Sequence, residues 1–375
     1  IPNGGIRMVV TDGAGSGAAI TDVLDVLGGT GNIALGSGAM GIALTTGTDN
    51  VAVGENAGDA LTSGSDNTFV GDEAGGATTT GANNIAIGSA ALDGNTTASD
   101  NIAIGINALG ASNTSANNVA IGSGAMDANT GGSGVAIGKD ALGANTTGGS
   151  NTAVGYVALT ANTTGSGNVA VGAGALDAAT TANNNTAVGA DSLSAATTGH
   201  SNTAVGKEAG EALTTGVSTV FIGSGAGEAA TTGDYNTAVG ADALTALTTA
   251  SNNTAVGYAA LISATTGGYN SALSRQALYS TTTGTYNTAA GSSALYTNTT
   301  GGDNVAIGAD ALLDATTGNR NTALGKSAGA NLTTGDDNTA IGRMALFTAT
   351  TVSDLVAVGK NALYANTSGT GNTGL

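Results

Sequence analysis

Apolar and polar positions follow a short unit that recurs from residue 32 to residue 375. The unit begins Asn-x-Ala-(Val/Ile)-Gly, continues with an Ala-Leu pair, and then reads Thr-Thr-Gly. We number the Asn as position 0, which puts Gly at position 4, Ala-Leu at 7 and 8, and Thr-Thr-Gly at 12 to 14. The spacing is seventeen residues, except for eighteen after Asn32 and sixteen after Asn118. The chain therefore holds twenty full repeats and the start of another at Asn372.

Each repeat predicts one short strand and its turns. Positions 1 to 3 are mostly apolar or Thr and often β-branched, and Asn and Gly flank them, which is typical of a strand between turns. Seventeen residues are too few for two helices and a turn. We therefore predict an all-β, parallel β-solenoid (a β-roll) of about 20 coils, each coil one repeat, with strands about 4.8 Å apart.

Position 8 is usually Leu or Met, but it is Gly at three places where a Leu follows three residues later. The three pairs are Gly58 with Leu61, Gly210 with Leu213, and Gly329 with Leu332. We interpret this exchange as volume compensation inside a packed layer, because an unfilled gap destabilises a core.

Strand neighbours point to opposite faces, so positions 2 and 3 are expected to differ in orientation. Position 3 is always apolar and is predicted to face the coil interior, which turns the Ala of position 2 outward. An outward column of Ala favours close packing against another chain and a multi-chain rod. The alternative is a flattened coil with both columns inside. The candidate lateral-interface residues are Ala153, Ala170, Ala187 and Ala204.

Residues 1–31 do not repeat, so we divide the chain into a segment 1–31 and a solenoid 32–375. Residues 6–10 indicate a strand, while residues 20, 23, 24 and 27 have helical spacing. We interpret the segment as a cap, or as a subunit-joining element for head-to-tail association. Its candidate joining residues are Ile6, Met8, Val9, Val10, Ile20, Val23, Leu24 and Leu27. The start at Ile1 instead of Met favours a processed, exported protein.

Composition narrows the function. Charged residues are 9% and aromatic residues 3%, with 64 Gly, so a core of large side chains is excluded. The net charge of −18 argues against binding nucleic acid or anionic membrane surfaces. No apolar run approaches the ~20 residues that span a bilayer. With no Cys and one His, His200, triads and His-rich or Cys-rich metal sites lack their components. We therefore expect a protein that is not an enzyme.

Three further sets of residues suggest binding. Acids directly before the Asn of position 0 are candidate calcium ligands, with solvated turn residues as the alternative. Paired Thr suggest ice binding, yet neighbouring strand residues cannot share one flat grid. Late tyrosines suggest an adhesive patch for a surface glycan or protein ligand. The calcium candidates are Asp49, Asp66, Asp100, Asp303 and Asp337. The tyrosines are Tyr235, Tyr258, Tyr269, Tyr279, Tyr286 and Tyr296.

The repeats resemble those of known surface proteins. Residues 118–122 and 304–308 are similar to the head repeats of YadA-like trimeric autotransporter adhesins. Residues 151–165 resemble repeats of bacterial surface and phage tail-fibre proteins. The resemblance covers residues 32–375 and implies a left-handed, commonly trimeric β-roll at the cell surface or outside the cell. The period departs from the adhesin head, whose coil is shorter.

From these observations we expect a structural subunit of an extracellular filament or fibre that associates with copies of itself. The alternatives are an adhesin head or phage-fibre shaft that binds a surface ligand and, as a minor one, an ice-binding solenoid.

Overall fold

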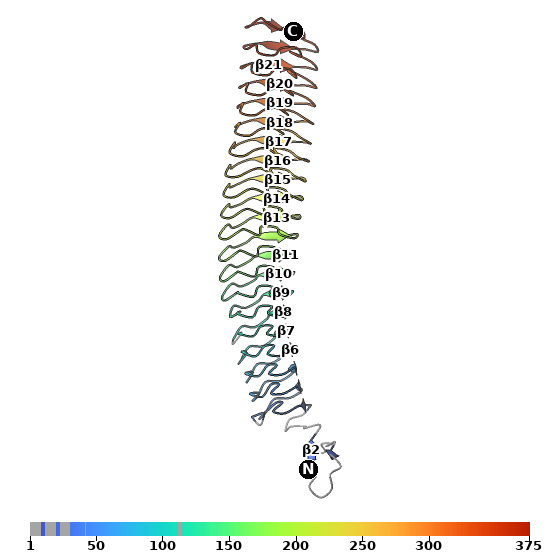
Figure 1. The fold of residues 1–375 in the computed structure, drawn as a ribbon, viewed down its shortest axis with the longest axis vertical. Coiled ribbons are helices and arrows are strands. Elements are labelled where there is room, and N and C mark those ends of the chain that lie inside the picture. Colours follow the sequence, from blue (N-terminus) through green and yellow to red (C-terminus); the bar gives the residue numbers. More distant parts are fainter. Residues whose placement is uncertain (1–8, 12–19, 23–30, 42, 112–113) are drawn as a thin grey trace. The chain divides into compact units, whose positions relative to one another are not determined.

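The computed structural model describes residues 9–11, 20–22, 31–41, 43–111 and 114–375. Its described residues are all-β and form a β-solenoid of about twenty turns, which confirms the predicted fold class. The chain divides into two compact units, Ile1–Ala182 (unit 1) and Asn183–Leu375 (unit 2). Within each unit one coil stacks on the next, as Figure 1 shows.

Every repeat contributes one short strand, of three residues in all but the last. The strands of unit 1 are β3 (Ile33–Leu35), β4 (Val51–Val53), β5 (Thr68–Val70), β6 (Ile85–Ile87), β7 (Ile102–Ile104), β8 (Val119–Ile121), β9 (Val135–Ile137), β10 (Thr152–Val154) and β11 (Val169–Val171). Those of unit 2 are β12 (Thr186–Val188), β13 (Thr203–Val205), β14 (Val220–Ile222), β15 (Thr237–Val239), β16 (Thr254–Val256), β17 (Ser271–Leu273), β18 (Thr288–Ala290), β19 (Val305–Ile307), β20 (Thr322–Leu324), β21 (Thr339–Ile341), β22 (Val356–Val358) and β23 (Thr373–Gly374).

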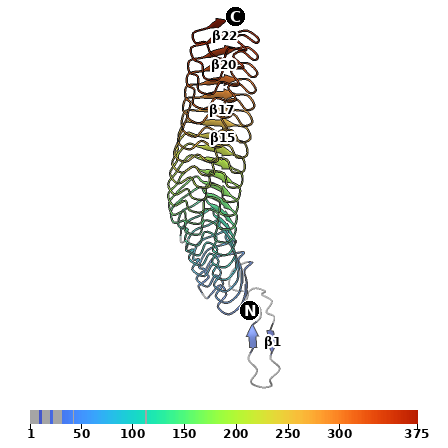
Figure 2. The same ribbon diagram turned by 45° about the horizontal axis from the view of Figure 1, so that its top comes forward.

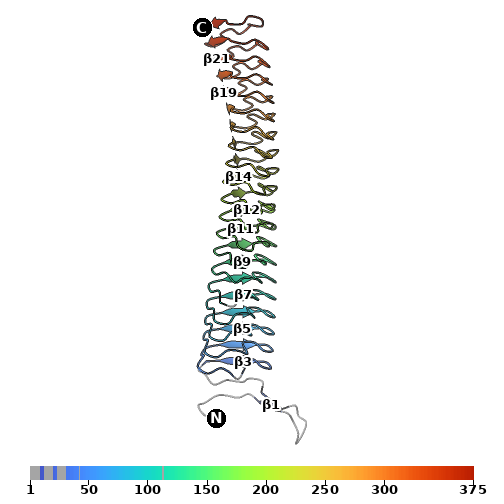
Figure 3. The same ribbon diagram turned by 90° about the vertical axis from the view of Figure 1, so that its left-hand side faces the viewer.

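Within each unit the strands pair in parallel with the strands of neighbouring coils, and equivalent positions stand side by side. Ala255 pairs with Ala238 and Ala272, for example. Figures 2 and 3 show the strands of unit 2 following one another in a single column. The two irregular intervals leave this register intact, since Ala34 pairs with Ala52 and Ala120 with Ala136. The extra and the missing residue are therefore accommodated in the turns.

Hydrogen bonds between coils continue around the turns. In the coil that starts at Asn151, the N–H of Leu159 donates to the carbonyl of Ala175 (2.9 Å), and that of Thr163 to the carbonyl of Thr180 (2.9 Å). The N–H of Val157 donates in the other direction, to the carbonyl of Lys139 (3.0 Å). Each coil is thus bonded to both neighbours on several sides, which satisfies backbone groups that would otherwise be buried without partners.

The interior is packed with small side chains, and the predicted orientation of the strand was wrong. The Ala residues of position 2 are fully buried, whereas the aliphatic residues of position 3 face outward. The candidates Ala153, Ala170, Ala187 and Ala204 all have no exposed surface, so they are core residues and not a lateral interface. The flattened-coil alternative was also wrong, because the two columns lie on opposite faces. The coil is so narrow that, at most repeats, only a methyl group fits between the strand and the Ala-Leu turn facing it.

Two coils make an exception with a phenylalanine at position 2. Phe69 and Phe221 are both fully buried. A Cβ built on Gly210 would lie 2.7 Å from the ring of Phe221, and one built on Gly227 would lie 2.6 Å from it. Each phenylalanine thus occupies space that two position 8 side chains fill elsewhere. Leu61, Leu213 and Leu332 are buried, as volume compensation requires, but the rings explain Gly58 and Gly210 more directly.

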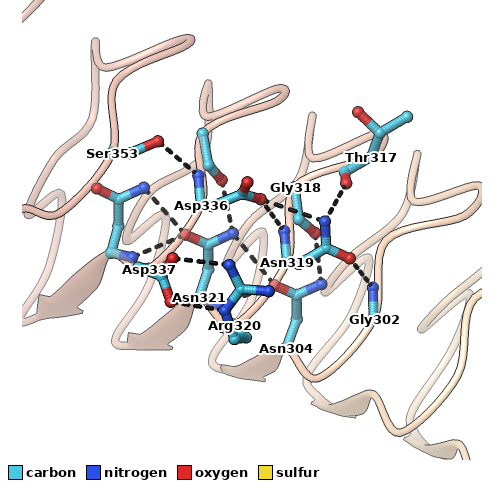
Figure 4. A network of polar contacts seen from close by, with 12 residues as sticks. Gly302, Asn304, Thr317, Gly318, Asn319, Arg320, Asn321, Asp336, Asp337 and Ser353 are labelled. Atoms are coloured by element: carbon cyan, nitrogen blue, oxygen red, sulfur yellow. Dashed lines mark hydrogen bonds and ion pairs between the residues drawn. The ribbon is translucent and has the colours of Figure 1, made fainter.

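A ladder of asparagine side chains runs through the interior at position 0. The amide group of Asn304 donates to the carbonyl of Gly318 in its own coil (2.8 Å). Its Oδ1 accepts from the backbone N–H of Asn321 (2.9 Å) and from the amide group of Asn321 (3.2 Å). Figure 4 shows this arrangement. In this ladder Asn304 thus bonds both to a turn of its own coil and to the next coil.

Position 4 needs glycine because of its backbone conformation. Gly240 has φ of 138°, and a Cβ there would lie 2.6 Å from the carbonyl oxygen of Gly257 in the next coil. Ser274 is the one other residue at this position in unit 2, and its φ of 126° lies in the same region. That region is costly for any side chain, about 1–3 kcal/mol.

We therefore expect Ser274→Gly to raise the free energy of unfolding by about 1 kcal/mol, after subtracting the greater chain entropy of glycine. Ser292→Gly is the matched control, because Ser292 is exposed and lies outside the positive-φ region. The control is expected to lower stability slightly. Thermal unfolding followed by circular dichroism measures both variants, and a destabilised Ser274→Gly would contradict the strain.

The non-repeating N-terminal segment contains a hairpin. Strands β1 (Val9–Thr11) and β2 (Ile20–Asp22) pair antiparallel, with Val10 opposite Thr21. The strand predicted around Val9 and Val10 is confirmed at those residues, whereas the helical spacing predicted from Ile20 is wrong there, because Ile20 lies in β2. The other candidate joining residues, Ile6, Met8, Val23, Leu24 and Leu27, lie outside the described residues.

Candidate interaction surface

The outer face of the strands carries two exposed columns, at positions 1 and 3. Position 3 supplies aliphatic side chains such as Ile307, which is 42% exposed, and Leu324, which is 46% exposed. Position 1 is Val or Ile in some coils and Thr or Ser in the others. The sequence analysis did not predict this outer face, because it placed position 3 inside the coil. The Thr and Ser at position 1 could have indicated it. Positions 1 and 3 share a face, and polar side chains favour the solvent side.

Charged residues border this face on both sides. Position 5 lies just beyond the strand and carries six of the eight basic residues, all exposed. They are Lys139, Lys207, Arg275, Lys326, Arg343 and Lys360. Position 16 lies just before the next Asn and is acidic in several coils of unit 2, as at Asp303, Asp337 and Asp354. Positions 5 and 16 thus form two exposed corners of the coil.

Two of the calcium candidates already have partners within the chain. The guanidinium group of Arg320 donates to both carboxylate oxygens of Asp337, at 2.7 and 2.8 Å, as Figure 4 shows. This contact lowers the pKa of Asp337. Asp100 accepts a hydrogen bond from the amide group of Asn83 (3.1 Å). Among the described residues, no three His, Cys, Asp or Glu side chains come close enough to hold a metal ion. Asp49, Asp66 and Asp303 therefore belong to no such cluster.

A second set of acids lies at position 9 of unit 1, where Asp and Gly alternate. A Cβ built on Gly76 would lie 3.1 Å from Oδ1 of Asp93 and 3.5 Å from Oδ1 of Asp59. The two carboxylates thus flank the same small space. Partial burial, followed by the charge of Asp59, raises the pKa of Asp93.

We expect this pair to make stability depend on pH. A carboxyl whose pKa is raised by folding binds its proton more tightly in the folded state, so stability rises as the pH falls through that pKa. The melting temperature of Asp93→Asn should exceed that of the wild type at pH 7, and the difference should shrink towards pH 4. Asp314→Asn, which removes one charge from unit 2, is the control. A difference that is independent of pH would contradict the prediction.

Aromatic side chains stack between coils in the middle of unit 2. The rings of Tyr269 and Tyr286 lie 4.9 Å apart, and those of Tyr279 and Tyr296 lie 4.8 Å apart. Tyr269 and Tyr286 are more than half exposed. Stacking covers the ring faces between the two residues, so the pair presents mainly ring edges and hydroxyl groups to a partner.

The two Thr columns have different environments. At position 12 the hydroxyl group donates to the carbonyl of the next coil, as from Thr231 to Thr248 (2.9 Å) and from Thr248 to Thr265 (3.0 Å). At position 13 the side chains are exposed, as at Thr232 and Thr249. The paired Thr therefore do not form one outward grid, as the sequence predicted.

The chain has one histidine, His200. His200 is exposed, and its Nδ1 lies 3.3 Å from Oγ of Ser201, its neighbour in the chain.

Among the described residues, no helix has the length and apolar character needed to cross a membrane. Comparison with protein-family models, curated proteins and solved structures finds no match to this chain.

Proposed function

We propose that the chain is a structural subunit of an extracellular filament or fibre, in which stacked coils supply length and stiffness. The observation that carries the proposal is the bonding between coils. Backbone groups, asparagine amides and threonine hydroxyls all link one coil to the next, as in the coils that start at Asn287, Asn304 and Asn321. Such an array resists bending and local opening, because each coil is held by its neighbours.

Electron microscopy of the purified protein in negative stain tests this proposal. We expect filaments of uniform width that are much longer than one chain. Discrete particles no longer than about 100 Å, the most that about twenty coils at ~4.8 Å each can span, would contradict self-assembly of this chain into filaments. They would favour a module within a larger fibre.

A second candidate function is ligand binding by an adhesin head or fibre shaft, and the exposed tyrosine pair favours it. Tyrosine is enriched in binding surfaces because one end is apolar and the other forms hydrogen bonds. A glycan array probed with the wild type and with a Tyr269→Ala/Tyr286→Ala variant tests this candidate. Binding that the double variant loses supports it, and equal binding by both proteins contradicts a role for the pair.

A further inference from the structure

The exposed strand face of unit 2 has opposite charges on its two borders in its last coils. Beyond strands β20, β21 and β22 lie Lys326, Arg343 and Lys360, and before β21 and β22 lie Asp337 and Asp354. Every residue of unit 2 is described, and none of its ion pairs involves these three basic residues. Asp354 likewise has no ion pair. The position 5 border is therefore basic and unpaired. The position 16 border carries Asp337 and Asp354 together with Arg320, which is bonded to Asp337.

Between the borders the column at position 3 is apolar and partly exposed, and the column at position 1 is Thr or Ser in eight of the eleven coils and Val in the other three. Leu324 is 46% exposed, Val356 40% and Val358 37%. Eleven coils at ~4.8 Å, with about five extended residues across, make a strip of roughly 850 Å². That area approaches the ~800 Å² per partner of a standard protein interface. A charge-poor strip of this size with charged borders has the anatomy of an interface with an apolar centre and a polar rim.

The borders also select an orientation for a second copy. If two copies meet face to face and run in the same direction, a two-fold axis along the stack puts position 5 of one copy opposite position 16 of the other. Arg343 then faces Asp337 of the second copy, and Lys360 faces its Asp354. Lys326 faces Arg320, whose charge is already balanced by Asp337, so two of the three charged levels are complementary. If the copies run in opposite directions, position 5 meets position 5, which carries no acid anywhere in unit 2.

We propose that the strand face of unit 2 binds a second copy of this chain running in the same direction, with the basic border of each copy against the acidic border of the other. The proposal rests on the proposed fibre function and names the lateral contact within it. Close charge pairs between copies fix register and direction, while the aliphatic centre supplies the buried apolar area.

Light scattering after size-exclusion chromatography tests the contact. The smallest wild-type species, outside any filaments, is expected at twice the 35.1 kDa of one chain. Lys360→Asp puts two acids together and should weaken self-association by about tenfold or more, since like charges that meet across an interface repel each other. The swap Asp354→Lys/Lys360→Asp restores opposite charges across the contact and should return association to near the wild-type level. Position 16 tolerates a long cation, because Arg320 occupies it with φ of 54°.

Disulfide trapping tests whether the two copies run in the same direction. The chain has no native Cys, so only the introduced cysteines can cross-link. Copies carrying Asp337→Cys and copies carrying Arg343→Cys, mixed and oxidised, should cross-link to each other. Asp337→Cys mixed with Lys207→Cys should not. A wild type that is monomeric, a swap variant that stays monomeric, or cross-linking of Arg343→Cys to itself would overturn the proposal.

Leu324→Asp is a second variant for the apolar centre, and it should also produce monomers. Unchanged association of both Leu324→Asp and Lys360→Asp would exclude this face. Electron microscopy separates the two proposals. Filaments without pairing contradict only the lateral contact, and paired discrete particles contradict only the filament.

Discussion

Asn304→Ala is expected to lower the free energy of unfolding by about 4 kcal/mol, because it orphans two buried backbone groups at about 1–3 kcal/mol each, along with lost packing. The carbonyl of Gly318 loses the amide donor, and the N–H of Asn321 loses the Oδ1 acceptor. No water reaches these groups easily, since Asn304 and Asn321 are almost completely buried. The loss should be local, because each coil contacts only its neighbours.

Hydrogen exchange measured by mass spectrometry, together with thermal unfolding, checks this expectation. Protection should fall most in the coils that contain β18, β19 and β20. Asn304→Thr is the control, since Thr219 occupies position 0 and donates from Oγ1 to Oδ1 of Asn202 (3.0 Å). It should cost clearly less than Asn304→Ala. A change below about 0.5 kcal/mol in Asn304→Ala would show that the ladder contributes little beyond ordinary surface substitutions.

Phe221→Ala should destabilise the chain by about 3–5 kcal/mol, the usual cost of truncating a buried aromatic side chain. The ring lies between the backbones of Gly210 and Gly227, neither of which has a side chain to fill the space. Collapse of the cavity is limited, because the hydrogen bonds between coils hold their spacing.

Leu substitutions at the two glycines should restore the stability that Phe221→Ala loses. The triple variant Phe221→Ala/Gly210→Leu/Gly227→Leu restores the common pattern of Ala at position 2 and Leu at position 8, and should recover most of the loss. Gly227→Leu alone should destabilise, because its Cβ would lie 2.6 Å from the Phe221 ring. The sign of the Leu substitution therefore reverses with the residue at position 221, and additive effects of the three changes would contradict the packing.

Much of the fold was predictable because the repeat is internally consistent. Local signals for strand, turn and packing agree in each repeat, and twenty repeats average out their exceptions. The parallel register followed from the spacing, as the pairing of Ala255 with Ala272 shows. The asparagine ladder was predictable too, since a recurrent amide beside a turn has few other uses.

The candidate surface was less predictable, because alternation along a strand determines which residues share a face but not which face is inside. Val and Ile at position 3 are the more hydrophobic residues, yet they lie outside, and Ala at position 2 lies inside. Hydrophobicity favoured position 3 as the inner column. The narrow space inside the coil instead required the smaller Ala of position 2 there. The missed clue was the near-invariance of Ala at position 2, which marks a tight internal fit, against the variation of Val, Ile and Leu at position 3.

The amino-acid sequence by itself determined the period, the parallel stacking and the positions of the turns, because these depend on local propensities and on equal spacing. Tertiary structure alone decided the inner face, the coupling of Phe221 to two glycines in successive coils, and the partner of each charged side chain. Those features depend on distances across the coil and between coils, where residues such as Arg320 and Asp337 meet from seventeen positions apart.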